Sequence, residues 1–106
     1  MKLLNLTLTK HPFDLMEREL KRIEFRREST WIASRLIGKQ YTHVKFTNGY
    51  GADKPWFIAE FKGVIRMSKM MRISYDAGKL VIWSLPGDFV IFLGDVIERG
   101  NIKKRN

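Results

Sequence analysis

Residues 19–28 read "ELKRIEFRRE", and within this stretch the spacing of apolar residues changes from helical to alternating. Ile23 and Phe25 are separated by Glu24, and charged residues flank the pair on both sides. Successive side chains of a strand point to opposite faces, so the alternation predicts a half-buried strand with a charged outer face. The stretch therefore predicts that a helix ends near Lys21 and that a strand follows it.

Short helices are predicted on both sides of this strand. Pro12 suits the first turn of a helix, and the apolar residues after it follow at helical spacing, which predicts a helix over residues 12–20. After the predicted strand, Ser29 or Thr30 can cap a second helix and Gly38 can end it.

The remaining apolar runs predict strands. They cover residues 3–9, 22–27, 40–47, 56–66, 79–85 and 89–98. The last run is apolar on both faces, which predicts a central strand. The order strand, helix, strand, helix and then mostly strands predicts an α+β fold, in which about six strands form a small, strongly curved sheet or barrel with two short helices.

Composition indicates one basic domain over residues 1–106. The chain has 44% hydrophobic residues, no apolar run long enough for a membrane span, and an alternating start that reads as a first strand and not as a signal peptide. Cysteine is absent, which excludes disulfides and thiolate metal sites and fits a cytoplasmic protein of bacterial or phage origin. A formal charge of +9 favours a polyanionic partner.

Aromatic residues interleaved with cations point to single-stranded nucleic acid, which binds by base stacking and phosphate contacts. Tyr50 and Trp56 flank a loop rich in turn-forming residues and are the expected stacking residues, whereas Trp31 is expected to pack in the core or at its rim. The residues expected to contact nucleic acid are Lys21, Arg22, Glu24, Arg26, Arg27, Lys45, Tyr50, Lys54, Trp56, Arg66, Lys69 and Arg72.

Lys21, Glu24 and Arg26 have the spacing K-x-x-E-x-R, which resembles the signature G-x-K-x-x-E-x-R of the ASCH family, part of the PUA-like superfamily. Glu19 stands where that pattern has glycine, and this departure predicts a different helix exit. "FDLMERELK", "WFIAEFKGV" and "FVIFLGDVIE" resemble other segments of the family, so the similarity spans most of the chain. The resemblance implies a PUA-like β-barrel and a pocket beside it that serves RNA-related binding.

The residues themselves support the same kind of site. Glu24 and Arg26 share one face of the predicted strand, and Lys21 lies at the junction between helix and strand. Such a group supplies several donors and one oriented acceptor, which suits a nucleotide or an unstacked RNA base, with single-stranded DNA as a further possibility. The structural alternative is a solvated strand face with cross-strand ion pairs.

Two other functions stay open. Some small proteins that resemble this family are amidohydrolases on acylated cytidine and others resemble ribonucleases; in such a hydrolase Lys21 and Glu24 would be catalytic. The amidohydrolases carry Thr at the position of Glu24 and a further downstream Glu, for which Glu60 is the candidate. Alternatively, the methionine-rich stretch 67–71 docks on another protein.

Other kinds of site are not supported by the sequence. His11 and His43 are far apart and have no carboxylate at metal-ligand spacing, so we expect no metal and no cofactor. Residues 99–106 read as a basic, flexible tail.

Overall fold

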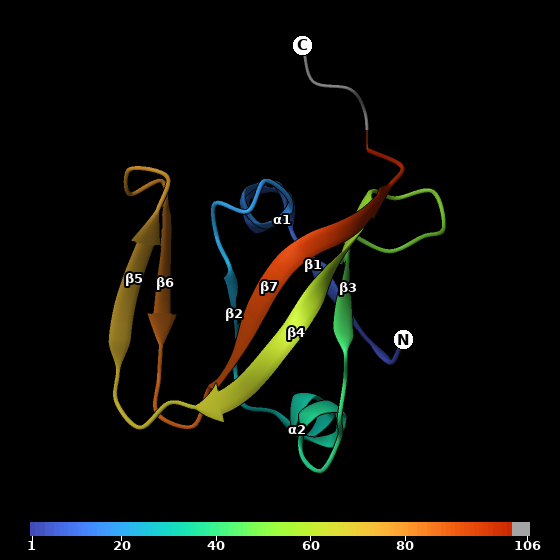
Figure 1. Ribbon diagram of the computed structural model, residues 1–106. Coiled ribbons are helices and arrows are strands. Elements are labelled where there is room, and N and C mark those ends of the chain that lie inside the picture. The colour runs from blue at the N-terminus through green and yellow to red at the C-terminus, as the bar shows by residue number, and fades with distance from the viewer. Residues whose placement is uncertain (103–106) are drawn as a thin grey trace.

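The computed structural model describes residues 1–102, which form an α+β fold with two short helices (Figure 1). The helices are α1 (Lys10–Glu17) and α2 (Thr30–Leu36). The strands are β1 (Leu3–Leu8), β2 (Ile23–Arg26), β3 (His43–Asn48), β4 (Trp56–Arg66), β5 (Met71–Tyr75), β6 (Leu80–Ser84) and β7 (Phe89–Gly100). The expected number of about six strands is therefore too low.

The strand that sequence patterns did not predict is β5. Its residues read "MRISY", and only Ile73 and Tyr75 are half-buried while the others are exposed. Met71, Ile73 and Tyr75 alternate with polar residues, but this row is short and at most half-buried. β5 pairs only with β6, in a separate two-stranded sheet. Figure 1 shows this hairpin standing beside the main sheet.

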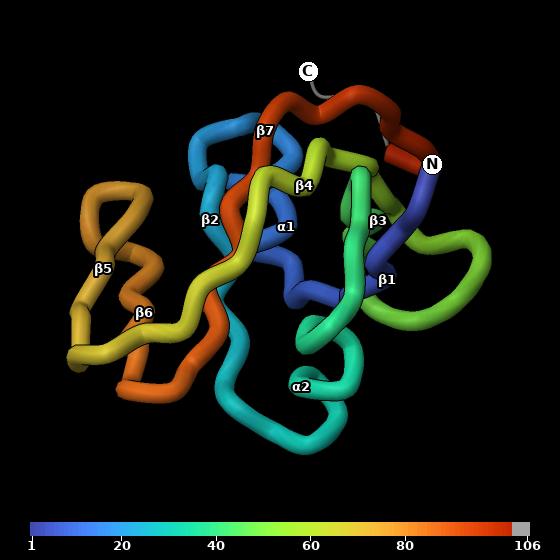
Figure 2. The backbone as a smooth tube through the Cα atoms, turned by 60° about the horizontal axis from the view of Figure 1, so that its bottom comes forward, coloured from blue at the N-terminus to red at the C-terminus, as the bar shows by residue number. Residues whose placement is uncertain are grey.

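The main sheet has five strands in the order β1-β3-β4-β7-β2 and curls into a half-barrel (Figure 2). β1 and β3 are parallel, and the other neighbouring pairs are antiparallel. The prediction that the last strand is central is confirmed, because β7 pairs with β4 on one side and with β2 on the other. Register shifts in the β4–β7 pairing accompany the strong curvature of these long strands.

The two outer strands of the curled sheet, β1 and β2, share no backbone pairing. Instead, the Arg26 guanidinium at the end of β2 donates a hydrogen bond to the Thr7 carbonyl oxygen of β1, with Nη2 and O 2.6 Å apart. We call this junction between the two outer strands the seam. A side chain therefore joins the edges where a closed barrel would use a ladder of backbone hydrogen bonds.

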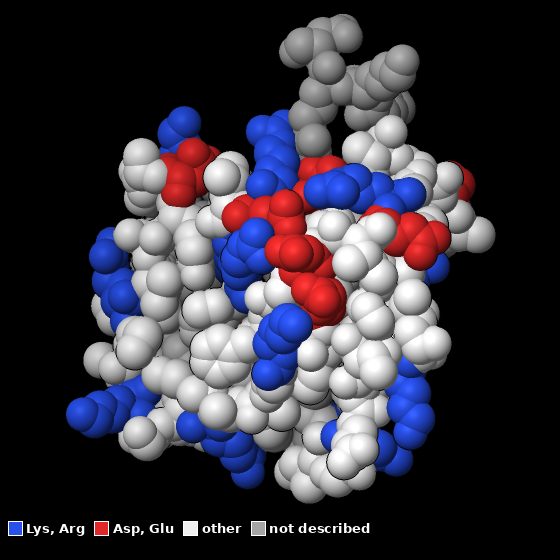
Figure 3. Space-filling view, viewed as in Figure 1, with Lys and Arg blue, Asp and Glu red and all other residues white. Residues whose placement is uncertain are grey.

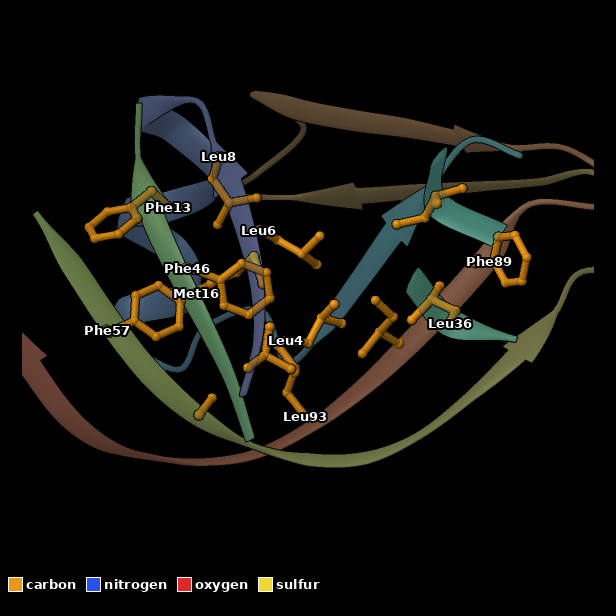
Figure 4. Close-up of a cluster of buried hydrophobic side chains, with 14 residues drawn as sticks. Leu4, Leu6, Leu8, Phe13, Met16, Leu36, Phe46, Phe57, Phe89 and Leu93 are labelled. Carbon is orange, nitrogen blue, oxygen red and sulfur yellow. The ribbon is translucent and has the colours of Figure 1, made fainter. Parts of the chain in front are cut away.

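The core fills the inside of the curled sheet (Figure 4). At one end of the core, the Phe57 ring has its centroid 5.1 Å from that of Phe13 of α1 and 5.2 Å from that of Phe46 of β3. The other buried members of the cluster are Leu4, Leu6, Leu8, Met16, Ile32, Leu36, Val44, Ala59, Phe89, Ile91 and Leu93. Alternate residues of β1 and β3 contribute to it, as the sequence alternation predicted.

Both helices form near the predicted positions, but α1 is shorter than expected. It covers Lys10–Glu17 and leaves Leu20 exposed, because Glu19 takes a left-handed backbone conformation with φ of 61° that ends the helix. In α2 the predicted cap is confirmed: the Ser29 hydroxyl accepts a hydrogen bond from the Ile32 amide, 3.1 Å away. Gly38 follows α2 with φ of 71°, a conformation that glycine favours.

The C-terminal part of the chain departs from the expectation of a tail that begins at residue 99. Arg99 lies in β7, where its guanidinium donates to the carboxylate and to the backbone carbonyl of Glu17. Ile102 packs against the core cluster, so residues 99–102 are part of the fold. Residues 103–106 lie outside the described residues. Within residues 1–102, no helix is long and apolar enough to cross a membrane.

Candidate functional site

A pocket of about 290 Å³ opens at the seam and contains the residues of the Lys-Glu-Arg motif. Its walls come from the end of β1, the start of α1, β2 with its flanking residues, and β6 of the hairpin. The lining residues are Thr7, Leu8, Thr9, Pro12, Lys21, Glu24, Phe25, Arg26, Arg27, Leu80 and Ile82. We call it the seam pocket. These four parts of the chain meet only in the folded protein.

Lys21 is buried in the wall of the seam pocket, with a side-chain exposure of 0%. Its ammonium donates to the backbone oxygen of Ile23 at 2.5 Å and lies 3.5 Å from Glu24 Oε1 and 3.5 Å from the sulfur of Met16. Burial lowers the pKa of the Lys21 ammonium below its ordinary value of 10.5, and the Glu24 carboxylate opposes that shift. The pocket thus holds a desolvated amine with one ionic partner.

Two aromatic rings cover the Lys21 ammonium. Phe25 of β2 and Tyr75 of β5 have ring centroids 5.7 Å and 5.6 Å from Nζ. Burial also raises the pKa of the Tyr75 hydroxyl above its ordinary value of 10.0. Tyr75 belongs to the hairpin, so the hairpin covers the amine from the side that the main sheet leaves open.

The Glu24 carboxylate is held by contacts on both oxygens. Oε1 accepts a hydrogen bond from the Phe25 amide at 3.2 Å, and Oε2 accepts one from Arg26 Nε at 2.8 Å. An ionised carboxylate offers about four acceptor positions, so acceptor capacity remains beyond these bonds. The group is oriented as a single acceptor among donors.

The expectation that this charged face points outward to solvent is wrong. Glu24 has a side-chain exposure of 6%, whereas Ile23 and Phe25 on the other face are only half-buried. β2 is an outer strand of a curled sheet, and its inward face lines the seam pocket. Charges can lie there because Lys21 and Arg26 neutralise Glu24.

Arg27 joins the motif residues at the mouth of the seam pocket. Its Nε lies 3.3 Å from Asp88 Oδ2, and its Nη2 donates to the backbone oxygen of Trp83 in β6. Asp88 is buried and also accepts hydrogen bonds from the backbone amides of Leu85 and Glu28. Arg27 and Asp88 together tie the segment after β2 to the hairpin.

The hairpin is also tied to α1 at its far end. The Nε2 atom of His11 in α1 lies 3.0 Å from Asp76 Oδ2 in the turn between β5 and β6. His43 instead contacts the Thr42 hydroxyl at 2.7 Å. Within the described residues no group of three or more His, Cys, Asp or Glu side chains could hold a metal ion.

Several predicted contact residues lie away from the seam pocket. Arg22 points to Glu19 and Asp95, and the Lys45 ammonium lies 4.5 Å from the Trp56 ring centroid. Glu60, the candidate downstream acid, does not line the pocket and accepts a hydrogen bond from the Asp95 amide.

The basic residues around the hairpin base form a separate region. Arg66 pairs with Glu28 and covers the Phe89 ring, and Arg72 lies over Trp83 at 6.0 Å. Lys69 is exposed in the connection between β4 and β5, next to the exposed Met70. Of the expected nucleic-acid-binding set, the seam pocket therefore contains Lys21, Glu24, Arg26 and Arg27.

The loop between β3 and β4 carries Tyr50 and Lys54, which line two different pockets. Tyr50 is 84% exposed, as expected for a residue between two glycines. Trp31 is 50% exposed and is not part of the core cluster, so it does not pack in the core. The buried side of α2 is formed by Ile32 and Leu36, and Trp31 lies off that side.

Sequence reasoning missed the residues that reach the seam pocket from distant segments. Leu80 and Ile82 come from β6 and Thr7 from β1, and Tyr75 of β5 lies over the Lys21 ammonium without lining the pocket. Leu80 and Ile82 alternate on a predicted strand, but no local signal shows that this strand faces β2. Predicting that these residues meet requires knowledge of which distant segments lie beside one another in the fold.

The outer face of β4 and β7 carries both signs of charge. Figure 3 shows acidic side chains gathered over these strands, with Lys and Arg between them. Lys62 pairs with Glu60, and Arg22 pairs with Asp95 on this side of the molecule. The positive charge of the chain is therefore not concentrated on this face.

Comparison of the chain with protein-family models, with curated proteins and with solved structures gives no match.

Proposed function

We propose that the seam pocket binds an unstacked base or a nucleotide of single-stranded RNA. The observation that carries the proposal is the burial of Lys21 and Glu24 together in the wall of a pocket, with Arg26 beside them. Buried ion pairs contribute little net stability, because the loss of hydration offsets their attraction. Binding of a ligand to these groups would explain why the fold keeps an ion pair buried at this position.

The chemistry of the pocket suits a nucleotide. Arg26 supplies donors, Glu24 is held by Lys21 and supplies an acceptor for an exocyclic amine, and the ring of Phe25 supplies a flat surface. Arg27 at the mouth provides a cation for a phosphate. The volume of about 290 Å³ lies at the lower limit of ordinary ligand pockets, which favours one base over a large cofactor.

The resemblance to the ASCH pattern supports the same proposal. All three motif residues line the seam pocket. Glu19, at the position where the pattern has glycine, takes the left-handed conformation that glycine favours. Its carboxylate accepts a hydrogen bond from the Val96 amide at 2.9 Å, a contact that helps to hold this conformation.

The test is a salt titration of affinity for a short fluorescent single-stranded RNA, measured by anisotropy. Arg27→Gln should weaken binding and reduce the salt slope by about one, since one phosphate contact is lost. Glu24→Gln should change the preference among the four nucleoside monophosphates, since an acceptor becomes a mixed donor and acceptor. A DNA strand of the same sequence reports whether the ribose hydroxyl matters.

Arg22→Gln is the matched control, because Arg22 is an exposed arginine on the same segment but lies outside the seam pocket. The control should lose less affinity than Arg27→Gln. Equal losses in the two variants, together with an unchanged base preference for Glu24→Gln, would show attraction by net charge alone and refute the proposal.

A hydrolase is the second candidate, favoured by the lowered pKa of Lys21 next to the Glu24 carboxylate. A neutral amine can accept a proton from water that attacks an acyl group, so that N-acylcytidine and water give cytidine and a carboxylic acid. Incubation with N-acetylcytidine tests this reaction. Turnover that disappears in Lys21→Arg would support it, and absence of product with the wild-type protein would reject it.

A further inference from the structure

A second pocket of about 190 Å³ lies next to the seam pocket, on the outer side of β1 and β3. It is lined by Asn5, Leu6, Thr7, Trp31, Thr47 and Tyr50. Thr7 lines both pockets, so they meet along β1. We call this second site the aromatic pocket.

The aromatic pocket is framed by two rings from distant parts of the chain. Trp31 comes from the first turn of α2 and is 50% exposed, and Tyr50 comes from the loop after β3 and is 84% exposed. Neither ring belongs to the core cluster. Folding therefore places two large exposed aromatic side chains at one pocket without using them in the core.

The floor of the aromatic pocket is polar. Asn5, Thr7 and Thr47 occupy the positions of β1 and β3 that alternate with core residues, so their side chains face outward. Thr7 and Thr47 are also directly opposite in the register of the two strands. Amide and hydroxyl groups under exposed rings can bond the edge of a planar heterocycle.

Two guanidinium groups contact residues that line the aromatic pocket. The Arg35 guanidinium is 5.3 Å from the Trp31 ring centroid. The Arg26 guanidinium donates to the carbonyl of Thr7, the residue shared by the two pockets. Cations beside exposed rings are typical of sites that bind single-stranded nucleic acid by base stacking and phosphate contacts.

We propose that the aromatic pocket is a stacking subsite for a second base, next to the base in the seam pocket. The ligand is then a single-stranded oligonucleotide of at least two nucleotides, which crosses β1 at Thr7. This inference rests on the proposed function and extends it from one base to a strand. A free nucleotide would use the seam pocket only, and a longer strand would use both.

The experiment compares one nucleoside monophosphate with a tetranucleotide RNA, both titrated by calorimetry. Trp31→Ala and Tyr50→Ala should each weaken tetranucleotide binding by about 5- to 150-fold, the range measured for loss of one stacking partner. Both variants should bind the monophosphate as the wild type does. Trp31→Phe should restore part of the affinity, because a phenyl ring still stacks.

Trp83→Ala is the matched control, because Trp83 is 51% exposed but lies on β6 and lines neither pocket. It should leave both affinities unchanged. If Trp31→Ala and Tyr50→Ala bind the tetranucleotide as tightly as Trp83→Ala does, the aromatic pocket is not a stacking subsite.

The two proposals fail in different ways. Monophosphate binding that depends on Arg27 and Glu24, without any effect of Trp31 or Tyr50 on the tetranucleotide, overturns the aromatic subsite and leaves the seam pocket. Tetranucleotide binding that depends on Trp31 and Tyr50, without monophosphate binding, supports the aromatic subsite and rejects the seam pocket as a base site.

Discussion

Arg26 Nη2 lies 2.6 Å from the carbonyl oxygen of Thr7, and this hydrogen bond joins two strands that share no backbone pairing. The same guanidinium donates through Nε to the Glu24 carboxylate at 2.8 Å. One side chain thus links the edges of the curled sheet and orients the acceptor of the seam pocket. Structure and proposed binding depend on the same planar group.

Arg26→Lys tests this double role. Lysine keeps the charge, but a single ammonium cannot reproduce the fork that reaches both Glu24 and Thr7. We expect a loss of about 1.5–3 kcal/mol in the free energy of unfolding, the usual contribution of a hydrogen bond to a charged group. Urea denaturation measures it. Arg72→Lys, an exposed arginine on the hairpin, is the control, and an equal effect of both substitutions would contradict the role of Arg26.

Lys21 makes stability depend on pH. Its pKa is lower in the folded chain than the ordinary value of 10.5, so in the pH range between the two values the unfolded chain binds more protons. The free energy of unfolding therefore rises as the pH increases through that range. Lys21→Met removes this term, and its unfolding free energy should rise less with pH than that of the wild type.

The unfolding free energies of Lys21→Met and the wild type should be compared below pH 10.0, which is the ordinary pKa of a tyrosine side chain. Above it, the raised pKa of Tyr75 acts in the opposite direction, because stability is lost as that hydroxyl ionises. Urea denaturation at a series of pH values gives both slopes. Parallel slopes for the two proteins would show that Lys21 is not desolvated in the folded state.

Tyr75→Ala should uncover the Lys21 ammonium. The ring that covers Nζ from the hairpin is removed, hydration of the amine increases, and the pKa of Lys21 moves back toward 10.5. Access of the reagent to Nζ increases as well, so reductive methylation of Lys21, followed by mass spectrometry, should proceed faster than in the wild type although the higher pKa lowers the fraction of reactive neutral amine. Ser74→Ala, a substitution at an exposed neighbour, should leave the rate unchanged. An unchanged rate in Tyr75→Ala would mean that the hairpin does not control access.

Arg99→Met should destabilise the fold, because Arg99 donates to the buried Glu17 at 2.9 Å and to its backbone carbonyl at 3.0 Å. We expect a loss of about 1.5–3 kcal/mol, measured by urea denaturation. Glu98→Gln, at an exposed position beside it, should change stability by less than about 0.5 kcal/mol. If Arg99→Met is as stable as the control, residue 99 behaves as the tail that the sequence predicted.

Gly100→Ala should strain the end of β7. A Cβ at this position would overlap the indole ring of Trp56, the residue opposite it in β4. Overpacking of this kind costs about 1–3 kcal/mol. A double substitution with Trp56→Val should recover part of the loss, because the smaller side chain makes room. If the double variant is no more stable than Gly100→Ala, the loss of stability comes from the backbone and not from contact with the Trp56 ring.

Local patterns in the sequence were sufficient for most elements of the fold. Helical spacing, the Ser29 cap and the alternating runs predicted two helices and all strands except β5. They also predicted that Glu24 and Arg26 share a face, because residues two apart on a strand always do. These inferences succeed because hydrogen bonding and side-chain direction within one element depend only on near neighbours.

The tertiary structure alone decided which faces are buried and which residues meet. Glu24 points into a pocket because β2 is an outer strand that faces β1 across the seam, and Tyr75 reaches Lys21 from a hairpin far along the chain. Trp31 and Tyr50 meet at one pocket for the same reason. Local spacing sets which side chains share a face, but burial depends on the partner that packs against that face, and the partner comes from elsewhere in the sequence.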